Sequence, residues 1–432
     1  MILQKSSIDL DKASYKKIEE IVEWYMYTIK QEYRNDYISP FKYEDYLIAI
    51  SETLPLLDDK CKDVYLEIGY SLIKGIKHKL EYDFEFYKNS SMIIGLGYSA
   101  FAVNIFFKKT GLLKNFSHSL NSLLLEECYN RVVFLINNTK EGTNDIDYDL
   151  IYGVSGVLNY ILDFEWSDEY IVKIKKMGEY LIYMSSDYEY DGYIITKYHM
   201  RYEYFINDVD KSRFPKGCVN FGIAHGILGP LISMAKLKNK VNSIDGIDKA
   251  IYKILNLYDV FVNKDKDYYR WPTQVSVEDY TNKMFDIGYS QIASWCYGST
   301  SIANGLKNVY LSLNENYMVY EYRDILKKLL TEDFDEYGLY TPNLCHGYSS
   351  LLTMITVAYK ETNDKLYLYN LERNLHEIFQ SFNPSLRYGF ESLSDMEKIE
   401  NTSILEGTTG IVLSLISVLS DETCYEKLLF LK

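Results

Sequence analysis

The apolar residues of this chain recur mostly at three- and four-residue spacing, the periodicity of α-helices with one buried face. The N-terminal stretch Ser14–Tyr33 places apolar side chains at this spacing between lysines and glutamates. Glu44–Thr53 and Val64–Leu80 continue the same pattern. We therefore expect an all-α fold.

A second pattern is a glycine turn followed at once by an apolar, helix-like run. It occurs six times, at intervals of about 50 to 75 residues. The first two examples are Met92–Ala100 and Asp149–Leu158, and the other four contain His225, Cys296, Cys345 and Glu406. A period of this length predicts a repeated helical hairpin.

These repeats are best explained by a ring of helix pairs. Inner helices can be almost entirely apolar where outer, amphipathic helices cover them, and glycines let the chain turn tightly near the axis. We expect one domain spanning residues 1–432, with all six turns at the same end of the ring. An open helical solenoid is the alternative, because periodicity alone does not determine closure.

One region departs from the helical pattern. Between Asp187 and Val219, tyrosines and isoleucines alternate with polar residues, and Asp191-Gly192 and Pro215 mark turns. This pattern predicts short strands, so we expect a small β-containing insertion at residues 185–219. Tyr268–Ser290 is expected to be an irregular lid or rim.

Composition narrows the classes of function. The chain has 432 residues, 47% of them hydrophobic, and a net charge of −15, which argues against nucleic-acid binding. Its 44 tyrosines supply amphipathic surface for a core or a peptide groove. The acidity suits a cationic peptide partner, and solubility explains it equally well.

The N-terminus lacks the apolar core of a signal peptide, and no run approaches the roughly 18–20 apolar residues that span a bilayer. We therefore expect a cytoplasmic protein, not membrane-spanning, whose thiols stay reduced. This favours metal binding or catalysis over disulfide formation for Cys296 and Cys345.

Cys296, Cys345 and the adjacent His346 are candidate zinc ligands. Each lies just before a glycine and an apolar helical run. Two thiolates and an imidazole suit Zn²⁺, and three protein ligands leave the fourth tetrahedral position open, as in catalytic sites. A structural site would need a fourth Cys or His, and neither segment supplies one.

Four ordered motifs resemble those of the lanthionine synthetase C-like (LanC) family. Trp295–Gly298 and Cys345–Gly347 are similar to its zinc signatures. Phe221–Gly229 resembles its Gly-x-Ala-His-Gly-x-x-Gly motif, and Leu405–Gly410 resembles its final Glu-Gly-x-x-Gly turn. The four segments are spread over nearly half of the chain.

The resemblance implies an α/α toroid with a small mixed domain inserted before the histidine motif. It also implies a zinc-dependent thioether cyclase that acts on a dehydrated precursor peptide, consisting of leader and core. Because the toroid occupies the whole chain, the dehydratase would be a separate partner. Association with that dehydratase and an exporter, in a membrane-bound complex, is a further expectation.

The resemblance and the chemistry together suggest catalytic residues. His225 would protonate the enolate formed during cyclisation, since His is the usual general acid near neutral pH. Asp149 matches a cavity aspartate of the family and either orients His225 or caps the following helix. Tyr297 either donates to the enolate or only packs, and Glu406 is expected to brace its own turn.

One departure separates this chain from the family pattern. Stand-alone cyclases of the family carry an arginine four residues before the zinc cysteine of the Trp-Cys motif, and here that residue is Ile292, beside Gln291. Three other functions stay open: a non-catalytic thiol-binding LanC-like protein, a scaffold for a modification complex, and an α/α-toroid glycosidase, which would need paired carboxylates.

Overall fold

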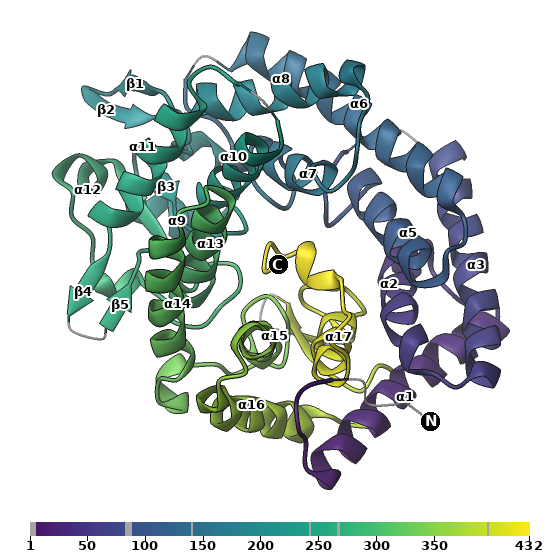
Figure 1. Cartoon of the computed structure of the whole chain (residues 1–432). Coiled ribbons are helices and arrows are strands. Elements are labelled where there is room, and N and C mark those ends of the chain that lie inside the picture. Colours follow the sequence, from purple (N-terminus) through teal and green to yellow (C-terminus); the bar gives the residue numbers. More distant parts are fainter. Residues whose placement is uncertain (1–5, 83–88, 140, 242, 266–267, 395–396) are drawn as a thin grey trace.

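The computed structural model describes residues 6–82, 89–139, 141–241, 243–265, 268–394 and 397–432. Its helices form two concentric rings (Figure 1). The inner helices are α2 (Tyr43–Thr53), α5 (Leu96–Thr110), α7 (Val154–Ile161), α10 (Leu228–Lys240), α13 (Ser299–Ser312), α15 (Tyr348–Thr362) and α17 (Thr408–Leu419). The outer helices are α1 (Lys12–Arg34), α3 (Asp59–Tyr82), α6 (Lys114–Asn138), α8 (Asp168–Met184), α11 (Ile247–Val260), α14 (Asn316–Leu330) and α16 (Leu368–Ser381). The all-α prediction is confirmed.

The two rings differ in how their helices are buried. Every residue of α17 is buried, and its sequence is almost entirely apolar or small. Outer helix α16 buries a single stripe that includes Leu371, Leu375 and Ile378. An apolar helix must be covered on all sides, whereas an amphipathic helix can face water, so hydrophobicity assigns each helix to its ring.

The first helix closes the ring on the last one. Helix α1 packs against α17, and α17 also packs against α2 (Figure 1). The buried hydroxyls of Tyr25 and Thr409 lie 2.5 Å apart across the α1–α17 contact. The backbone N–H of Ser7 also donates to Asp421, at 2.9 Å. The structure is therefore a closed toroid, and the open solenoid is excluded.

The six predicted glycine turns each lead into an inner helix, and backbone hydrogen bonds join neighbouring turns. These bonds are Met92 N–H to Ile151, Leu150 N–H to Ala224, Ile223 N–H to Cys296, Trp295 N–H to Cys345, and Cys345 N–H to Leu405. The glycines permit close approach of the backbone: a Cβ on Gly410 would lie 1.9 Å from the Ile404 carbonyl oxygen. Residues on distant turns are thereby brought together at one end of the ring.

The predicted insertion begins as a β-hairpin. Strands β1 (Asp187–Tyr190) and β2 (Tyr193–Thr196) pair antiparallel. Asp191 and Gly192 have φ angles of 50° and 80°, as a tight two-residue hairpin turn requires. The strand prediction is confirmed for this half of the insertion.

The second half of the insertion differs from the prediction. Tyr202–Tyr204 form a 3₁₀ turn and Asp208–Arg213 form a short helix, α9, because the chain here buries Phe205 in a small apolar cluster. Strand β3 (Cys218–Asn220) then pairs with β6 (Gln274–Ser276), so the β-containing part reaches beyond residue 219.

The stretch Tyr268–Ser290, which we expected to be irregular, contains two strands and a helix. They are β5 (Tyr268–Arg270), β6 and α12 (Val277–Asn282). Strand β5 pairs with β4 (Asn263–Asp265), and a further hairpin joins β7 (Ser392–Ser394) to β8 (Glu397–Ile399). None of the helices in the described residues is long and apolar enough to cross a bilayer.

The C-terminal segment lies in the middle of the ring (Figure 1). Its Leu429 carbonyl accepts a hydrogen bond from the indole N–H of the buried Trp295, at 2.9 Å. The amide of Asn308 on α13 donates to the Phe430 carbonyl, at 3.2 Å. The chain terminus therefore supports the turn that carries Cys296.

Candidate metal centre

The predicted ligands lie on two adjacent turns at one end of the ring. Cys296 precedes α13, and Cys345 and His346 precede α15. The Cys345 carbonyl accepts hydrogen bonds from the backbone N–H groups of Trp295, at 3.0 Å, and Cys296, at 3.3 Å. These bonds hold the two turns together, and the two Sγ atoms lie 3.3 Å apart.

The three side chains fit a metal ion by geometry and by chemistry. Their ligand atoms all lie within 4.8 Å of one another, and in the described part of the chain no other such cluster of His, Cys, Asp or Glu was found. Zinc bonds of about 2.3 Å in a tetrahedron separate two sulfurs by roughly 3.7 Å, so a small widening of the pair would admit the ion. The donor set of two thiols and one imidazole suits zinc.

A hydrogen bond joins the two thiols. The Cys345 thiol donates to Cys296 Sγ, and this hydrogen bond lowers the pKa of Cys296 against the opposing effect of burial. The same contact and burial raise the pKa of Cys345. The Ser294 hydroxyl lies 3.1 Å from Cys296 Sγ and further stabilises a thiolate there.

His346 is surrounded by polar partners from two turns. Its backbone N–H donates to Asn343 Oδ1 at 3.1 Å, and its Nε2 lies 3.2 Å from Asn343 Nδ2. Asn343 Nδ2 also donates to Glu406 Oε2 at 2.6 Å. Glu406 therefore reaches the neighbouring turn and does not brace its own, contrary to the expectation. Asn401 holds the Glu406 turn instead, by accepting from Ser403.

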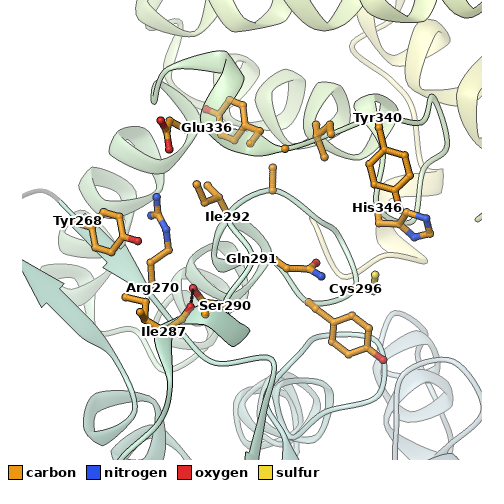
Figure 2. A pocket seen from close by; sticks show the side chains of 16 residues that line it. Tyr268, Arg270, Ile287, Ser290, Gln291, Ile292, Cys296, Glu336, Tyr340 and His346 are labelled. Carbon is orange, nitrogen blue, oxygen red and sulfur yellow. Dashed lines mark hydrogen bonds between the residues drawn. The ribbon is translucent and has the colours of Figure 1, made fainter. Parts of the chain in front are cut away.

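A cavity of about 620 Å³ opens beside the three ligands. Its walls include Cys296, His346 and Tyr297, together with residues of the Tyr268–Ser290 stretch, which therefore forms part of the rim. Figure 2 shows the Gln291 side chain pointing toward Cys296. The candidate centre thus faces open space on one side, as a catalytic metal site requires.

The residue in place of the family arginine lies in the same cavity. Ile292 lines the wall, and its carbonyl accepts from the Thr300 N–H at 3.0 Å. Arg270 also lines this cavity, but its guanidinium forms a two-point pair with Glu332, at 2.7 and 3.0 Å, and stacks over Tyr268. Its charge is therefore already neutralised.

His225 and Asp149 form a pair beside the metal cluster. Nδ1 of His225 lies 2.6 Å from Oδ2 of Asp149, which is fully buried. The other oxygen, Oδ1, accepts from the backbone N–H groups of Tyr152, at 2.6 Å, and Gly153, at 2.7 Å. Asp149 therefore orients His225 and also accepts the N–H groups at the start of α7. The two predicted roles, orienting the histidine and capping the helix, are both present.

The imidazole of His225 is enclosed by aromatic rings. Tyr152 stacks on it with ring centroids 6.0 Å apart, and the Tyr297 ring centroid lies 6.5 Å away on another side. Burial alone would lower the pKa of His225, but the hydrogen bond and charge of Asp149, with the charges of Asp145 and Cys296, together raise it. Burial also raises the pKa of the Tyr297 phenol, which stays protonated at neutral pH.

Three polar residues of this region were missed by the sequence analysis. Burial raises the pKa of Asp145 to about 6, and its charge acts on His225. Asn343 lies next to the ligands, and Asn220 accepts from the Gly222 N–H in the His225 turn. Their closeness to the glycine turns was the available signal, but nothing in the local sequence marks an asparagine or aspartate as part of a site.

Comparison with known proteins gives the family. The family model described as lanthionine synthetase C-like protein matches residues 52–430. This chain belongs to the lanthionine synthetase C-like family. The matched region includes Cys296, Cys345 and His346 and every inner helix except most of α2.

Individual relatives agree with this assignment. A curated relative, the nisin biosynthesis protein NisC of Lactococcus lactis subsp. lactis, is 26% identical over 306 residues, covering 68% of this chain and 67% of the relative. The solved structure titled nisin cyclase superposes with a TM-score of 0.77 at 20% identity and covers 98% of each chain. This structural likeness supports the toroid fold.

Proposed function

We propose that this protein is a zinc-dependent lanthipeptide cyclase. It adds cysteine thiols of a dehydrated precursor peptide to dehydroalanine or dehydrobutyrine residues and so closes lanthionine or methyllanthionine rings. The observation that carries this proposal is the cluster of Cys296, Cys345 and His346, the first and last of which line the cavity. The cavity residue Tyr297 links this cluster to the His225–Asp149 pair. Family membership and the nisin-associated relatives support it.

Cys296, Cys345 and His346 would hold the zinc ion. Zinc in such a site lowers the pKa of an incoming thiol, which is about 8.5 when free, so that a thiolate is available at neutral pH. The ligand thiolates offset the metal's charge, and the added thiolate therefore keeps its nucleophilicity.

The reaction is an addition without a leaving group. The peptide thiol loses its proton to water, its sulfur forms a bond to Cβ of the dehydro residue, and the Cα–Cβ π electrons move toward the neighbouring carbonyl. The resulting enolate then takes up one proton at Cα. The peptide keeps its mass, and two tasks fall to the protein: stabilising the enolate and supplying the proton.

His225 is the proposed proton donor. Its pKa is raised, so the imidazolium that must give up the proton is present near neutral pH. Asp149 holds Nδ1 and stabilises the charged ring, which leaves Nε2 as the donating atom. In this proposal the protonated Tyr297, which lines the cavity, and the Gln291 amide are available to hydrogen-bond the enolate oxygen.

The rival functions differ from cyclisation in testable ways. A thiol-binding protein needs the metal ligands but gains nothing from the His225–Asp149 pair, and a scaffold needs neither. A glycosidase needs two carboxylates across its cavity, whereas Glu336 is the single acidic residue among the described residues that line it. The site therefore favours the cyclase.

Several partners are part of this proposal. The precursor peptide would enter as an extended chain, with its leader bound by the insertion at residues 185–219. We propose a single toroid domain that works with a separate dehydratase and exporter, in the cytoplasm and near a membrane-bound complex. The exposed side chains of Ile194 and Ile206 make the insertion suitable for a peptide.

The deciding experiment offers the purified protein a dehydrated peptide with free cysteines. Because ring closure leaves the mass unchanged, the thiols that remain free for alkylation are counted by mass spectrometry. Loss of one thiol per ring, with zinc present at one equivalent, supports the proposal. A protein that binds the peptide or glutathione but closes no ring on any dehydrated peptide is a thiol-binding protein instead.

A further inference from the structure

Two side chains that have no part in the proposed reaction hold His346 in place. Asn343 accepts the His346 backbone N–H on its Oδ1, and its Nδ2 lies 3.2 Å from Nε2 of the imidazole. The same Nδ2 donates to Glu406 Oε2 at 2.6 Å. The second carboxylate oxygen, Oε1, lies 3.6 Å from Nδ1 of His346. Asn343 and Glu406 thus contact both nitrogens of one ring.

This arrangement is anchored by the backbone on both sides. The Leu405 carbonyl accepts from the N–H groups of Leu344, at 3.1 Å, and Cys345, at 3.0 Å. The turn that carries Glu406 is therefore fixed to the turn that carries His346. Asn343 is only 3% exposed, so its amide cannot exchange these partners for water.

The two ring nitrogens have different neighbours. Asn343 Nδ2 lies beside Nε2, whose single lone pair can serve either this contact or a metal. A metal bound at Nε2 would therefore replace the Asn343 contact and leave the Glu406 carboxylate near Nδ1. A carboxylate behind a metal-binding histidine holds the ring in place and strengthens the imidazole as a donor.

We infer that Asn343 and Glu406 are positioning residues for the metal centre. Asn343 holds the His346 backbone N–H and the Glu406 carboxylate, and Glu406 lies behind Nδ1, so that Nε2 can turn to a metal held by Cys296 and Cys345. This inference rests on the proposed function, because it takes the three-residue cluster to be a zinc site. It adds that the last glycine turn, some sixty residues after Cys345, tunes metal affinity.

The test uses Glu406→Gln in the full chain, because this change keeps the size of the side chain. An amide cannot accept from both Asn343 and the ring N–H, so the ring loses its partner. We expect zinc affinity to fall about 10–100-fold, as for other second-layer partners of metal ligands. Competition with a chromophoric chelator measures this without any peptide. Glu400→Gln, a nearby exposed carboxylate that accepts from the Tyr388 N–H, is the matched control and should bind zinc like the wild type.

Cobalt substitution supplies a second readout. In Glu406→Gln the sulfur-to-cobalt charge-transfer absorption should persist, because both cysteines are unchanged, while the ligand-field bands should shift as the imidazole contact weakens. Asn343→Ala should lower zinc affinity as well. Because both residues act through the His346 ring, the double variant should lose no more zinc affinity than the weaker-binding of the two single variants.

The outcomes separate this inference from the proposed function. A wild-type protein that binds no zinc overturns both. A wild type that binds zinc while Glu406→Gln binds it equally well, with unaltered cobalt bands, overturns only the positioning role. Fully additive losses in the double variant, or an equal loss in Glu400→Gln, would also contradict it.

Discussion

Asp149 binds the Nδ1 atom of His225 at 2.6 Å while its other carboxylate oxygen accepts two backbone N–H groups of its own turn. One buried aspartate therefore fixes the turn that precedes α7 and the imidazole that precedes α10. Since Leu150 N–H also donates to the Ala224 carbonyl, the two turns are joined by backbone and side chain together. This geometry orients the His225 ring and raises its pKa, so that the protonated ring, the form that a general acid needs, is favoured.

Replacing His225 should separate catalysis from metal binding. We expect His225→Asn to lower the turnover of ring closure about 10²–10⁴-fold, the usual contribution of a general acid. Zinc content and peptide affinity should not change, because the three metal ligands lie on other turns. Thiol alkylation measures turnover, and atomic absorption measures zinc. Normal turnover in this variant would make His225 structural.

The pH dependence should report the Asp149–His225 contact. The folded-state pKa of His225 lies above its ordinary 6.5: burial lowers it, but Asp149, Asp145 and Cys296 together raise it by more. The acid is thus mostly charged at pH 6.5 and loses its proton as the pH rises through the raised value, where kcat/KM for ring closure should fall. The stability that this contact contributes should be lost over the same interval.

Asp149→Asn should move the fall of kcat/KM to lower pH, since the charge of Asp149 then no longer opposes the effect of burial on the pKa of His225. Asp147→Asn is a suitable control, because Asp147 pairs with Arg131 and Thr143 and not with His225. Profiles of kcat/KM against pH for the three proteins make the comparison. A fall that stays at the same pH in Asp149→Asn would show that a different group titrates.

Removing one thiol should empty the metal centre. Cys345→Ala leaves Cys296 and His346 as a two-ligand set, which is too few for a stable zinc site. We expect strong loss of zinc in the purified protein. Cys128→Ala, a change of a buried cysteine elsewhere in the ring, should retain a full equivalent. A full equivalent of zinc in Cys345→Ala would refute the ligand assignment.

The contact between Trp295 and the C-terminal segment should contribute to stability. Trp295→Phe removes the indole N–H and leaves the buried Leu429 carbonyl without this donor, which costs about 1–3 kcal/mol in the free energy of unfolding. Trp166→Phe removes a similar bond to Ile161 at a partly exposed site and should cost less. Urea denaturation of both variants gives the comparison, and equal midpoints would contradict it.

The insertion should bind the leader through its exposed apolar residues. Ile194 is 60% exposed on β2 and Ile206 is 96% exposed after the 3₁₀ turn. Changing both to serine should weaken leader affinity in a titration, whereas Leu366→Ser, at a residue 60% exposed on another part of the ring, should not. Unchanged affinity in the double variant would remove the insertion from the leader site.

Periodicity was sufficient to predict the inner and outer helices, because the burial of each helix follows from its own residues. The glycine turns and the candidate ligands Cys296, Cys345 and His346 could likewise be picked out from local motifs. Closure could not, since it depends on the contact between α1 and α17, which lie at opposite ends of the chain.

The contacts that support the candidate site could not be predicted from the sequence either. Asn343 and Glu406 are 63 positions apart, and nothing near either residue indicates the other. The pairing of β3 with β6 is equally non-local. The aromatic stretch after Thr196 was wrongly predicted as strand, because its alternation does not show that Phe205 is buried against Phe214 and Cys218. Local sequence patterns specify which face of a helix is buried and where the chain turns. Which turns lie next to each other depends on the closed ring as a whole.

The most direct test of the proposed chemistry is ring closure in D₂O. Addition of a thiolate to a dehydro residue leaves an enolate that takes its Cα proton from solvent through the enzyme. After return to H₂O, each closed ring should retain one deuterium at Cα and remove one free thiol from the alkylation count. Thiols lost without carbon-bound deuterium, or deuterium and thiol counts that do not match, would contradict thiolate addition followed by protonation at Cα. Equal counts reached as fast without the protein would contradict catalysis by it.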